Sequence, residues 1–532
     1  MTLLAAVAYL ALFTALSWPA QDDGYTQSAH YALVRSLATG TPRVDTFYRE
    51  SGDLSYWHGH YYSVKAPGVA FVALPAYAAL DAVGLWPDGR RGALRLLALI
   101  SSVLPALALV LLVGRVADEL EPGSGLAVGL TLAVATIVMP LSTVAFSHIW
   151  SALLAFATFA VLLHERRRQA RLRLVAAAGV LAGLGVLFEY PTALAGLVLG
   201  ILAISRRRWL VRGLAYTGGV LLGIAPLLAY NDWAFGSPFH ISYVNAIVDR
   251  GVSGHDVVGS ASKGLFGVTW PSLRTISELL LESRGLLITT PIVAAGIAGL
   301  VLLIRGGRDR AAVWTALAIA IAYLVYNAGV TTPFGGAFGG WSPGPRYLVT
   351  ALPFALVALG VAYRRAPAPV IALAAVSVVT MTVVTATTPL VPAENVRLWW
   401  AGLKDNELTH TVGWLLGWKS TGFAPATPFL FGVGLVAVIA AHAFVSLRRP
   451  TMRELPAVVA TLAAWAYTVT SARPLVLDHP TETAGALALM VLAVAVALAV
   501  LAIRTEPETL HLPVGPLPDA SGGRDPPAPP RS

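Results

Sequence analysis

Two adjacent carboxylates, Asp22 and Asp23, follow directly on the first apolar segment of the chain. A carboxylate at the end of a membrane helix lies between water and hydrocarbon, where its pKa and its attraction for cations are easily tuned. The plainer interpretation is a pair of interface acids that stop the helix from sliding inward. The aromatic residues farther along this segment, and a lysine at its end, favour a functional pair.

That lysine is Lys65, at the end of an aromatic stretch that begins at Tyr56. It lies where the chain returns to an apolar segment, and no acid is next to it in sequence. An ammonium group at the edge of the bilayer suits a phosphate ligand. The alternative is a snorkelling lysine, whose apolar stem lies in the membrane while its ammonium group extends to the interface and binds no ligand.

Four further residues are candidates with weaker signals. Glu189 lies between two short apolar segments, where it either caps the following helix or belongs to a site. His148 lies in another hairpin and is either a hydrogen-bonded structural residue or a ligand-binding one. Arg346 begins an apolar segment after a glycine-rich run that is equally typical of a plain loop, and Arg284 closes a long polar segment.

Several kinds of chemistry are excluded or disfavoured by what the sequence lacks. Without cysteine, disulfides, thiolate catalysis and cysteine-ligated metals are excluded. The histidines show no HExxH or comparable spacing, so no metal is indicated, although a divalent metal is left open. Glycine patterns typical of nucleotide-binding loops are missing as well, which makes a nucleotide-linked donor an unlikely substrate.

The composition requires a membrane protein. Of 532 residues, 56% are hydrophobic and 12% are charged, and the mean hydropathy is +0.69. A soluble domain has about a quarter of its residues charged. The net charge of +9 therefore bears on membrane orientation, and we expect no nucleic-acid partner.

About fifteen segments are apolar enough to be considered as membrane helices. They lie near 3–19, 66–84, 94–114, 125–145, 148–163, 174–188, 190–205, 213–230, 286–304, 311–329, 347–363, 367–388, 425–446, 455–472 and 483–503. Segment 66–84 contains Pro67, Pro75 and Asp81, and we interpret it as a juxtamembrane or re-entrant helix. The first segment has no basic flank or clean cleavage site, and we interpret it as a signal anchor.

The arginine clusters then orient the remaining fourteen segments. If 66–84 does not cross the membrane, the clusters near 166–173, 206–212, 305–310, 364–365 and 448–453 all fall on the cytoplasmic side, as the positive-inside rule requires. The fold class predicted is an all-α polytopic bundle of about 14 transmembrane helices in one domain, 1–504. Outer loops are expected near 20–93, 231–285, 330–346 and 389–424, the first of them long and with juxtamembrane helices. Residues 505–532 are expected to form a disordered cytoplasmic tail.

These features resemble the GT-C membrane glycosyltransferases, in particular the branch of protein O-mannosyltransferases and lipid A aminoarabinose transferases. The resemblance rests on an acidic pair after the first span and on the order of the later motifs, which are scattered over residues 20–350. The matching segments are Asp22-Asp23, Tyr61-Tyr62-Ser63-Val64-Lys65-Ala66-Pro67-Gly68, Arg95, Gly183-Leu184-Gly185, Phe188-Glu189-Tyr190-Pro191, residues 230–238, Arg284-Gly285-Leu286 and Gly344-Pro345-Arg346-Tyr347-Leu348.

The resemblance implies transfer of a sugar from a polyprenyl-phosphate carrier to an acceptor hydroxyl on the non-cytoplasmic side, with inversion. The partners it implies are that lipid-linked donor, an acceptor glycan, lipid or protein, and the bilayer. Asp22 is then the first candidate for general base and Asp23 the second. Lys65 and Arg346 are expected to converge on the donor phosphate, with Arg284 a weaker candidate. The acceptor or sugar is expected to contact Tyr61, Tyr62, His60, His148 and Glu189.

Two other functions stay open at this point. A transporter or lipid flippase would also be polytopic, although it is expected to carry charges near the middle of the membrane. A non-catalytic GT-C-like binding or assembly protein is the other alternative, because Val64 and His148 stand where the family commonly has acids. The arginine-rich, lysine-poor composition favours a bacterial plasma membrane as the location.

Overall fold

The structure is a computed structural model that describes residues 2–167, 171–247, 268–307, 309–330, 336–392 and 395–478. The predicted span 483–503 and the predicted tail 505–532 lie outside the described residues, as do parts of three predicted outer loops.

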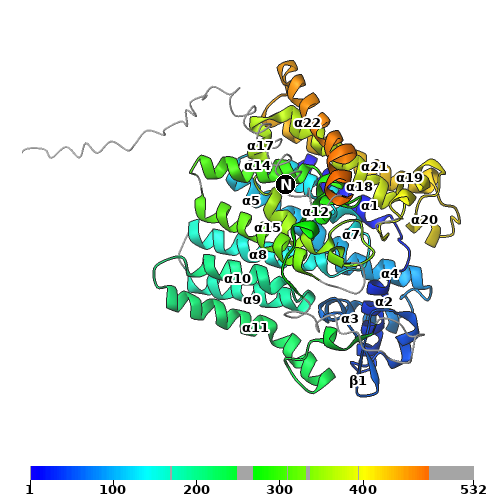
Figure 1. The fold of residues 1–532 in the computed structure, drawn as a ribbon. Helices are drawn as coiled ribbons and strands as arrows, with labels where there is room; N and C mark the ends of the chain where they lie inside the picture. Colours follow the sequence, from blue (N-terminus) through cyan, green and yellow to red (C-terminus); the bar gives the residue numbers. More distant parts are fainter. Residues whose placement is uncertain are drawn as a thin grey trace, which may run out of the picture.

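Helices dominate the described part of the chain (Figure 1). The longer ones are α1 (Leu3–Ser17), α2 (Tyr25–Ala38), α3 (Gly68–Ala82), α5 (Leu104–Leu120), α6 (Gly125–Val134), α8 (His148–Arg167), α9 (Leu172–Phe188), α10 (Thr192–Ile204), α11 (Trp209–Phe235), α14 (Ile292–Arg305), α15 (Arg310–Gly329), α18 (Pro367–Ala386), α21 (Phe423–Leu447) and α22 (Leu455–Tyr467). The shorter ones are η1 (Asp45–Glu50), α4 (Arg90–Ala98), η2 (Leu99–Val103), α7 (Val138–Ser142), η3 (Ser242–Asn245), α12 (Leu273–Leu281), α13 (Leu286–Thr289), η5 (Gly336–Phe338), η6 (Arg346–Ala351), α16 (Leu352–Leu356), α17 (Leu359–Arg365), α19 (Arg397–Lys404), α20 (Val412–Leu415), η8 (Met452–Glu454), η9 (Thr468–Ala472) and α23 (Arg473–Asp478).

Seven helical stretches in the described residues are long and apolar enough to cross a membrane, and two bent helix pairs bring the number to nine at most. The pairs are Leu273–Thr289 with Ile292–Arg305, bent by 89°, and Arg346–Leu356 with Leu359–Arg365, bent by 56°. Five shorter apolar helices accompany them, α3 among them. The helical membrane fold is therefore confirmed, whereas the predicted number of about 14 spans is not.

Glycines bring the backbones of α9 and α11 into direct contact. Each helix carries two glycines four residues apart, Gly179 and Gly183 on α9 and Gly219 and Gly223 on α11. A Cβ atom on any of the four would lie 2.1 to 2.4 Å from a backbone oxygen of the facing helix. This spacing is the small-residue pattern that lets membrane helices pack closely without a hydrophobic driving force between them.

Several arginine-rich loops meet at one end of the bundle. Arg167 at the end of α8 pairs with Glu119 of α5 and, at 2.9 Å, with Asp309 before α15. Arg166 donates to the Ser205 hydroxyl after α10 at 2.8 Å. These contacts gather the clusters near 166, 206 and 305–310, as the positive-inside assignment requires, while the membrane side that they face stays a prediction.

One arginine of these clusters is buried. Arg212 on α11 makes a two-pronged contact with the carboxylate of Glu165 on α8, at 2.7 and 2.9 Å, and its Nε donates to the Ala203 carbonyl of α10 at 2.6 Å. Both side chains are at most 5% exposed. The pair therefore fastens three helices to one another near the arginine-rich end.

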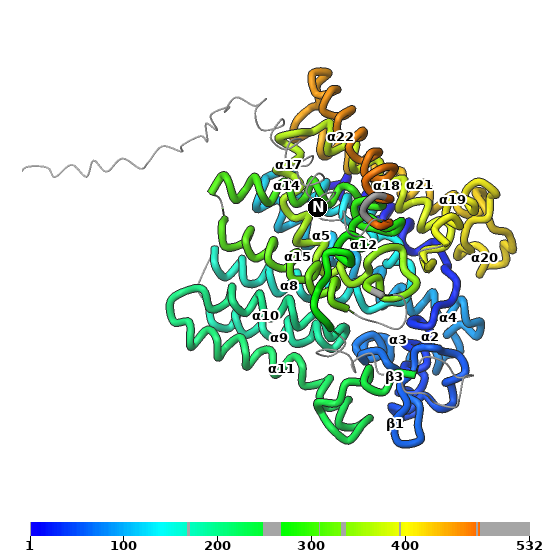
Figure 2. The backbone as a smooth tube through the Cα atoms, viewed as in Figure 1, coloured from blue at the N-terminus to red at the C-terminus, as the bar shows by residue number. Residues whose placement is uncertain are grey.

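The opposite end of the bundle carries a compact group of elements from the first outer loop, α2, η1, α3 and a small sheet (Figures 1 and 2). The sheet was not predicted; it has the order β2-β1-β3, with β1 (Leu54–Trp57), β2 (His60–Ser63) and β3 (Ala246–Ile247). His58 and Gly59, both with positive φ, form a two-residue turn between β1 and β2. Strand β3 comes from the second outer loop, so the sheet joins the two loops.

Segment α3 is a 15-residue helix interrupted by Pro75. It begins where Gly68 is pressed against the end of α9, since a Cβ on Gly68 would lie 2.7 Å from the Leu187 carbonyl oxygen. Side chains of α3 join α2 and the end of α9 in one apolar cluster. This packing against α2 agrees with the predicted juxtamembrane or re-entrant helix. The position of α3 relative to a membrane is untested.

Candidate functional site

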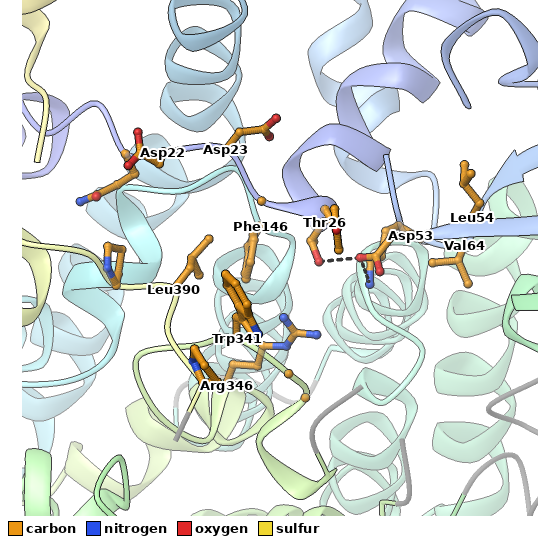
Figure 3. A pocket seen from close by; sticks show the side chains of 18 of the residues that line it. Asp22, Asp23, Thr26, Asp53, Leu54, Val64, Phe146, Trp341, Arg346 and Leu390 are labelled. Atoms are coloured by element: carbon orange, nitrogen blue, oxygen red, sulfur yellow. Dashed lines mark hydrogen bonds and ion pairs between the residues drawn. The ribbon is translucent and has the colours of Figure 1, made fainter. Parts of the chain in front are cut away.

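A cavity of about 840 Å³ opens between the first outer loop, the second outer loop and the segments after α15 and α18. Asp22 and Asp23 line one side, Asp53 another, and Arg346 a third (Figure 3). Lys65, which pairs with Asp53, also lines the cavity. Residues far apart in sequence thus meet around one space. Asp22, Lys65 and Arg346, which the sequence singled out separately, line the same cavity, as the predicted convergence on one ligand requires.

The position of Asp22 and Asp23 is fixed by the segment that precedes them. Gln21 is buried and bonds to the Thr143 hydroxyl, the Thr385 carbonyl and the Thr409 hydroxyl, at 2.8 to 3.2 Å. Arg95 of α4 donates to the last carbonyls of α1, those of Leu16 and Ser17, at 3.0 and 2.9 Å. A cation at the C-terminus of a helix satisfies carbonyls that have no partner within the helix.

The two aspartates pair with neighbouring arginines of α4. Asp22 accepts from Arg91 and Asp23 from Arg90, each at 2.5 Å. The side chain of Asp22 is 65% exposed, and its second oxygen accepts no hydrogen bond from a described residue. Asp22 is therefore the more accessible of the two for a ligand hydroxyl, while Asp23 is also held by Ser28.

Lys65 is buried and pairs with Asp53, a residue that the sequence analysis did not single out. The ammonium group lies 2.9 Å from Asp53 Oδ2, which also accepts from the Thr26 hydroxyl at 2.8 Å. Burial alone would raise the pKa of Asp53, but Lys65, the Thr26 hydroxyl and the more distant Arg346 together lower it below its ordinary value. Asp53 is thus held in its ionised form, with its side chain 16% exposed.

The pairing of Asp53 with Lys65 follows from the hairpin. Leu54 lies opposite Ser63 in the register of β1 and β2, so the residues just outside the strands, Asp53 and Val64, also meet. The amide of Val64 donates to the Asp53 carbonyl at 3.3 Å. An aromatic stretch interrupted by His-Gly is a hairpin signal, and it would have placed Asp53 beside Lys65.

Arg346 differs from the other charged residues that line the cavity. Each of those residues has an opposite charge within 4 Å, including Arg284, which lies 3.6 Å from Glu282. Within the described part of the chain, Arg346 has no such partner, although it is buried, and its Nε makes no hydrogen bond. Its guanidinium group points into the cavity (Figure 3). The inner wall thus presents a positive charge that has aromatic contacts with Phe146 and Tyr347 but no ion-pair partner within 4 Å among the described residues.

The glycine-rich run before Arg346 brings the backbone close to this guanidinium group. Gly339 has a φ of +77°, and a Cβ there would lie 2.6 Å from Arg346 Nε. Both Gly339 and Gly340 line the cavity. A side chain at 339 would therefore displace the arginine, which gives the run a role beyond that of a plain loop.

Arg284 lines the same cavity but is engaged with the backbone. Its Nη1 donates to the carbonyls of Gly340, Ser342 and Val391 at 2.8 to 3.4 Å. This arginine holds together the three segments that form the floor of the cavity. A role as a phosphate ligand stays a prediction that these contacts do not support directly.

Glu189 and His148 lie next to each other, behind the residues that line the cavity. The Glu189 side chain is 15% exposed and accepts from the Ser147 hydroxyl, with His148 Nδ1 3.5 Å away. Its side chain therefore does not cap α10, as one interpretation held. Burial raises the pKa of Glu189, opposed by Ser147, Lys65 and Arg346. His148 stacks against Tyr347, which does line the cavity.

The remaining predicted residues lie on β2, outside the lining of the cavity. His60 pairs with Asp45 at 2.8 Å, Tyr61 stacks on Tyr48, and Tyr62 packs against Phe235. These contacts stabilise the hairpin. Their assignment to sugar or acceptor binding stays a prediction. Among the described residues no group of three His, Asp or Glu could hold a metal ion, and the metal requirement stays untested.

A polytopic helical bundle that is capped at one end by loop-borne helices around a charged cavity is the architecture of the GT-C membrane glycosyltransferases, and this chain has that fold. The structure of ArnT from Cupriavidus metallidurans in the apo state shows it, with a TM-score of 0.51 at 18% identity over 89% of this chain and 78% of that one. Residues 88–231 match the family of dolichyl-phosphate-mannose-protein mannosyltransferases. The predicted GT-C resemblance is confirmed.

More distant similarity extends to two other solved structures. The arabinosyltransferase EmbB from Mycobacterium smegmatis has a TM-score of 0.45 at 15% identity, over 95% of this chain and 41% of that one. The oligosaccharyltransferase of Archaeoglobus fulgidus has a TM-score of 0.38 at 13% identity, over 90% and 59%. No curated protein matches the sequence.

Proposed function

We propose that this chain transfers a sugar from a polyprenyl-phosphate-linked donor to an acceptor hydroxyl, in the cavity between Asp22 and Arg346. The observation that carries the proposal is the buried guanidinium group of Arg346, which has no ion-pair partner within 4 Å among the described residues, in a cavity with an accessible carboxylate on another side. A buried cation without a partner is costly unless a ligand supplies the opposite charge. The description of the family matched by residues 88–231 names a lipid phosphate that carries a sugar.

The reaction would use the residues as follows. The acceptor oxygen forms a bond to the anomeric carbon of the sugar while Asp22 takes the hydroxyl proton. The bond between that carbon and the phosphate oxygen breaks, and its electron pair leaves with the phosphate. Arg346 and Lys65 stabilise the negative charge that develops there. Attack from the side opposite the phosphate inverts the configuration of the sugar.

The location proposed for this chemistry is the outer face of the membrane. It is supported by the arrangement of charges, since the arginine-rich loops gather at one end of the bundle. Helices α2 and α3 lie toward the other end (Figure 1), and residues of the same loop line the cavity. Basic loops face the cytoplasm in most membrane proteins. A lipid-linked donor would reach such a cavity from the outer leaflet.

The test is a transfer assay that does not require the sugar or acceptor to be known in advance. Purified protein is incubated with a panel of farnesyl-phosphate sugars and an acceptor extract, and the release of farnesyl monophosphate is measured by mass spectrometry. We expect acceptor-dependent release with at least one donor. Asp22→Asn should lower it by about 10²–10⁴-fold, the contribution of a general base.

Asp88→Asn is the matched control, because Asp88 is exposed between α3 and α4 and does not line the cavity. It should release farnesyl monophosphate at the wild-type rate. Failure of every donor in the panel would contradict a glycosyltransferase and favour a transporter or a binding protein. Equal rates in wild type and Asp22→Asn would move the general base elsewhere, to Asp23 or Glu189.

A further inference from the structure

Asp53 is an acid with a side chain only 16% exposed, inside a cavity that has to bind an anion. Its carboxylate contacts Thr26 and Lys65 and none of the exposed rim residues. An acid at such a place opposes phosphate binding, because it cancels the charge of one of the two cations that face the ligand. A simpler anion site would leave Lys65 unpaired, so the presence of Asp53 calls for an explanation.

Two other titratable groups near the pair, His30 and Glu189, lie outside the lining of the cavity. Burial, with a smaller effect of Lys65, lowers the pKa of His30 to about 3, so this histidine is neutral. Burial raises the pKa of Glu189, which makes no ion pair with Lys65 or Arg346 among the described residues. With Lys65 and Asp53 cancelling, the inner wall carries the single positive charge of Arg346.

The donor and the product of the proposed reaction differ in charge. A sugar phosphodiester carries one negative charge, whereas the phosphate monoester left after transfer carries about 1.5 to 2 at neutral pH. A wall with two free cations would hold the monoester more tightly than the diester, because the attraction grows with the charge of the ligand. The product would then compete with the next donor.

We propose that Asp53 sets the charge preference of this phosphate site, so that it accepts a phosphodiester and releases a phosphate monoester. The inference rests on the proposed function. Asp53 acts through Lys65, to which it is bound, and is therefore a positioning residue that does not touch the ligand. Its effect should appear in the relative affinity for the two kinds of phosphate, because loss of its charge would strengthen the binding of the dianionic monoester more than that of the monoanionic diester.

The test compares two ligands with the same farnesyl chain, farnesyl monophosphate and methyl farnesyl phosphate, which is a monoanionic diester. Their dissociation constants are measured on the full chain in detergent at about pH 8, where the monoester carries both charges. For Asp53→Asn we expect the ratio of diester to monoester dissociation constants to rise about tenfold over wild type, as removal of one nearby charge predicts.

Two further variants separate charge from packing. Asp53→Glu keeps the charge and should retain the wild-type ratio. The double variant Asp53→Asn with Lys65→Met leaves no buried unpaired charge at this position, and it should return the ratio toward wild type because Arg346 is again the single cation. Asp45→Asn is the matched control; this acid pairs with His60 on the same subdomain but does not line the cavity.

The outcomes distinguish the two proposals. If wild type binds both ligands and Asp53→Asn changes both affinities by the same factor, Asp53 is a packing residue and the inference is wrong, while the phosphate site stands. A double variant that behaves like Asp53→Asn alone would show that the effect does not pass through Lys65. If wild type binds neither ligand, the phosphate site itself is contradicted, and the role of Asp53 falls with it.

Discussion

Arg346 is the residue on which the phosphate site depends most. It is buried, it has no ion-pair partner within 4 Å among the described residues, and its position is shaped by Gly339, which leaves no room for a side chain. A guanidinium group offers a planar, two-pronged grip on phosphate that an ammonium group cannot reproduce. Phosphate binding should therefore depend on the guanidinium group of Arg346 as well as on its charge.

We expect Arg346→Lys to lower the rate of transfer by about 10²-fold, the size of effect found when one donor to a developing anion is lost. Lys65→Met should also lower turnover, since the methionine keeps the apolar stem and removes the ammonium group. Rates of farnesyl monophosphate release measure both effects. Arg274→Lys, at an exposed position of α12, is the matched control. Wild-type rates in Arg346→Lys would remove this arginine from the site.

The raised pKa of Glu189 predicts that the stability of the protein depends on pH. Its pKa is raised by burial, so the folded protein binds this proton more tightly than the unfolded chain does. The stability it contributes is full below the unfolded pKa of about 4.3 and is lost as pH rises through the folded pKa. Relative to Glu189→Gln, the thermal midpoint of wild type should fall as pH rises above that value.

Thermal unfolding of the detergent-solubilised protein across this pH range measures the difference. Glu407→Gln changes an exposed acid in the loop after α19 and serves as the control. Parallel midpoints for wild type and Glu189→Gln at every pH would show that Glu189 does not change its protonation on unfolding.

For single residues, the sequence identified several charged residues that line the cavity but not the contacts between them. Asp22, Lys65 and Arg346 were recognisable because each is a charge at the edge of an apolar segment. Asp53 was missed, because its position beside Lys65 depends on the register of a hairpin whose aromatic stretch had been interpreted only as a ligand-binding loop. The assignment of Tyr61 and Tyr62 to acceptor or sugar binding stays a prediction.

The helices themselves were predictable where apolar runs are long. Every predicted apolar segment within the described residues contains helix, because twenty apolar residues leave the backbone few alternatives in a bilayer. The bends between α13 and α14 and between α16 and α17 could not be read from hydropathy. They depend on turns at positions such as Pro291 and on packing against neighbouring helices.

The contact between α9 and α11 yields a stability prediction. In Gly219→Ala the new Cβ would lie 2.1 Å from the Ala176 carbonyl oxygen, so the helices must separate; overpacking of this kind costs about 1–3 kcal/mol. In Gly218→Ala, one residue earlier, the Cβ meets nothing within 4 Å. Thermal inactivation half-lives should shorten for Gly219→Ala and stay equal or lengthen for Gly218→Ala. Equal half-lives for the two variants would show that the helices are not closely packed.

The whole molecule has a polarity that the charges define. Arginine-rich loops gather at one end of the bundle, and the two outer loops build the cavity at the other. The sequence predicted that the arginine clusters of several loops share one side of the membrane. This prediction depends on the charge pattern of those loops and not on the exact number of spans. The sheet that joins the two loops lay beyond prediction, since β3 is two residues long.

Cysteine labelling tests the orientation in a chain without native cysteine. His58→Cys, at the exposed tip of the hairpin, should react with an impermeant thiol reagent in intact cells. Arg207→Cys, in the exposed turn before α11, should react only after permeabilisation. The reverse pattern would place the cavity on the cytoplasmic side and contradict an outer-leaflet donor.

The most direct test of the account is an experimental structure of the protein with a polyprenyl monophosphate bound. We expect the phosphate group inside the 840 Å³ cavity, within hydrogen-bonding distance of Arg346 and Lys65, with the Asp22 carboxylate facing the space beside it that a sugar and an acceptor would occupy. A phosphate held at the partly exposed arginines of α4, Arg90 and Arg91, with no ligand at Arg346, would contradict the assignment of the site and the mechanism derived from it.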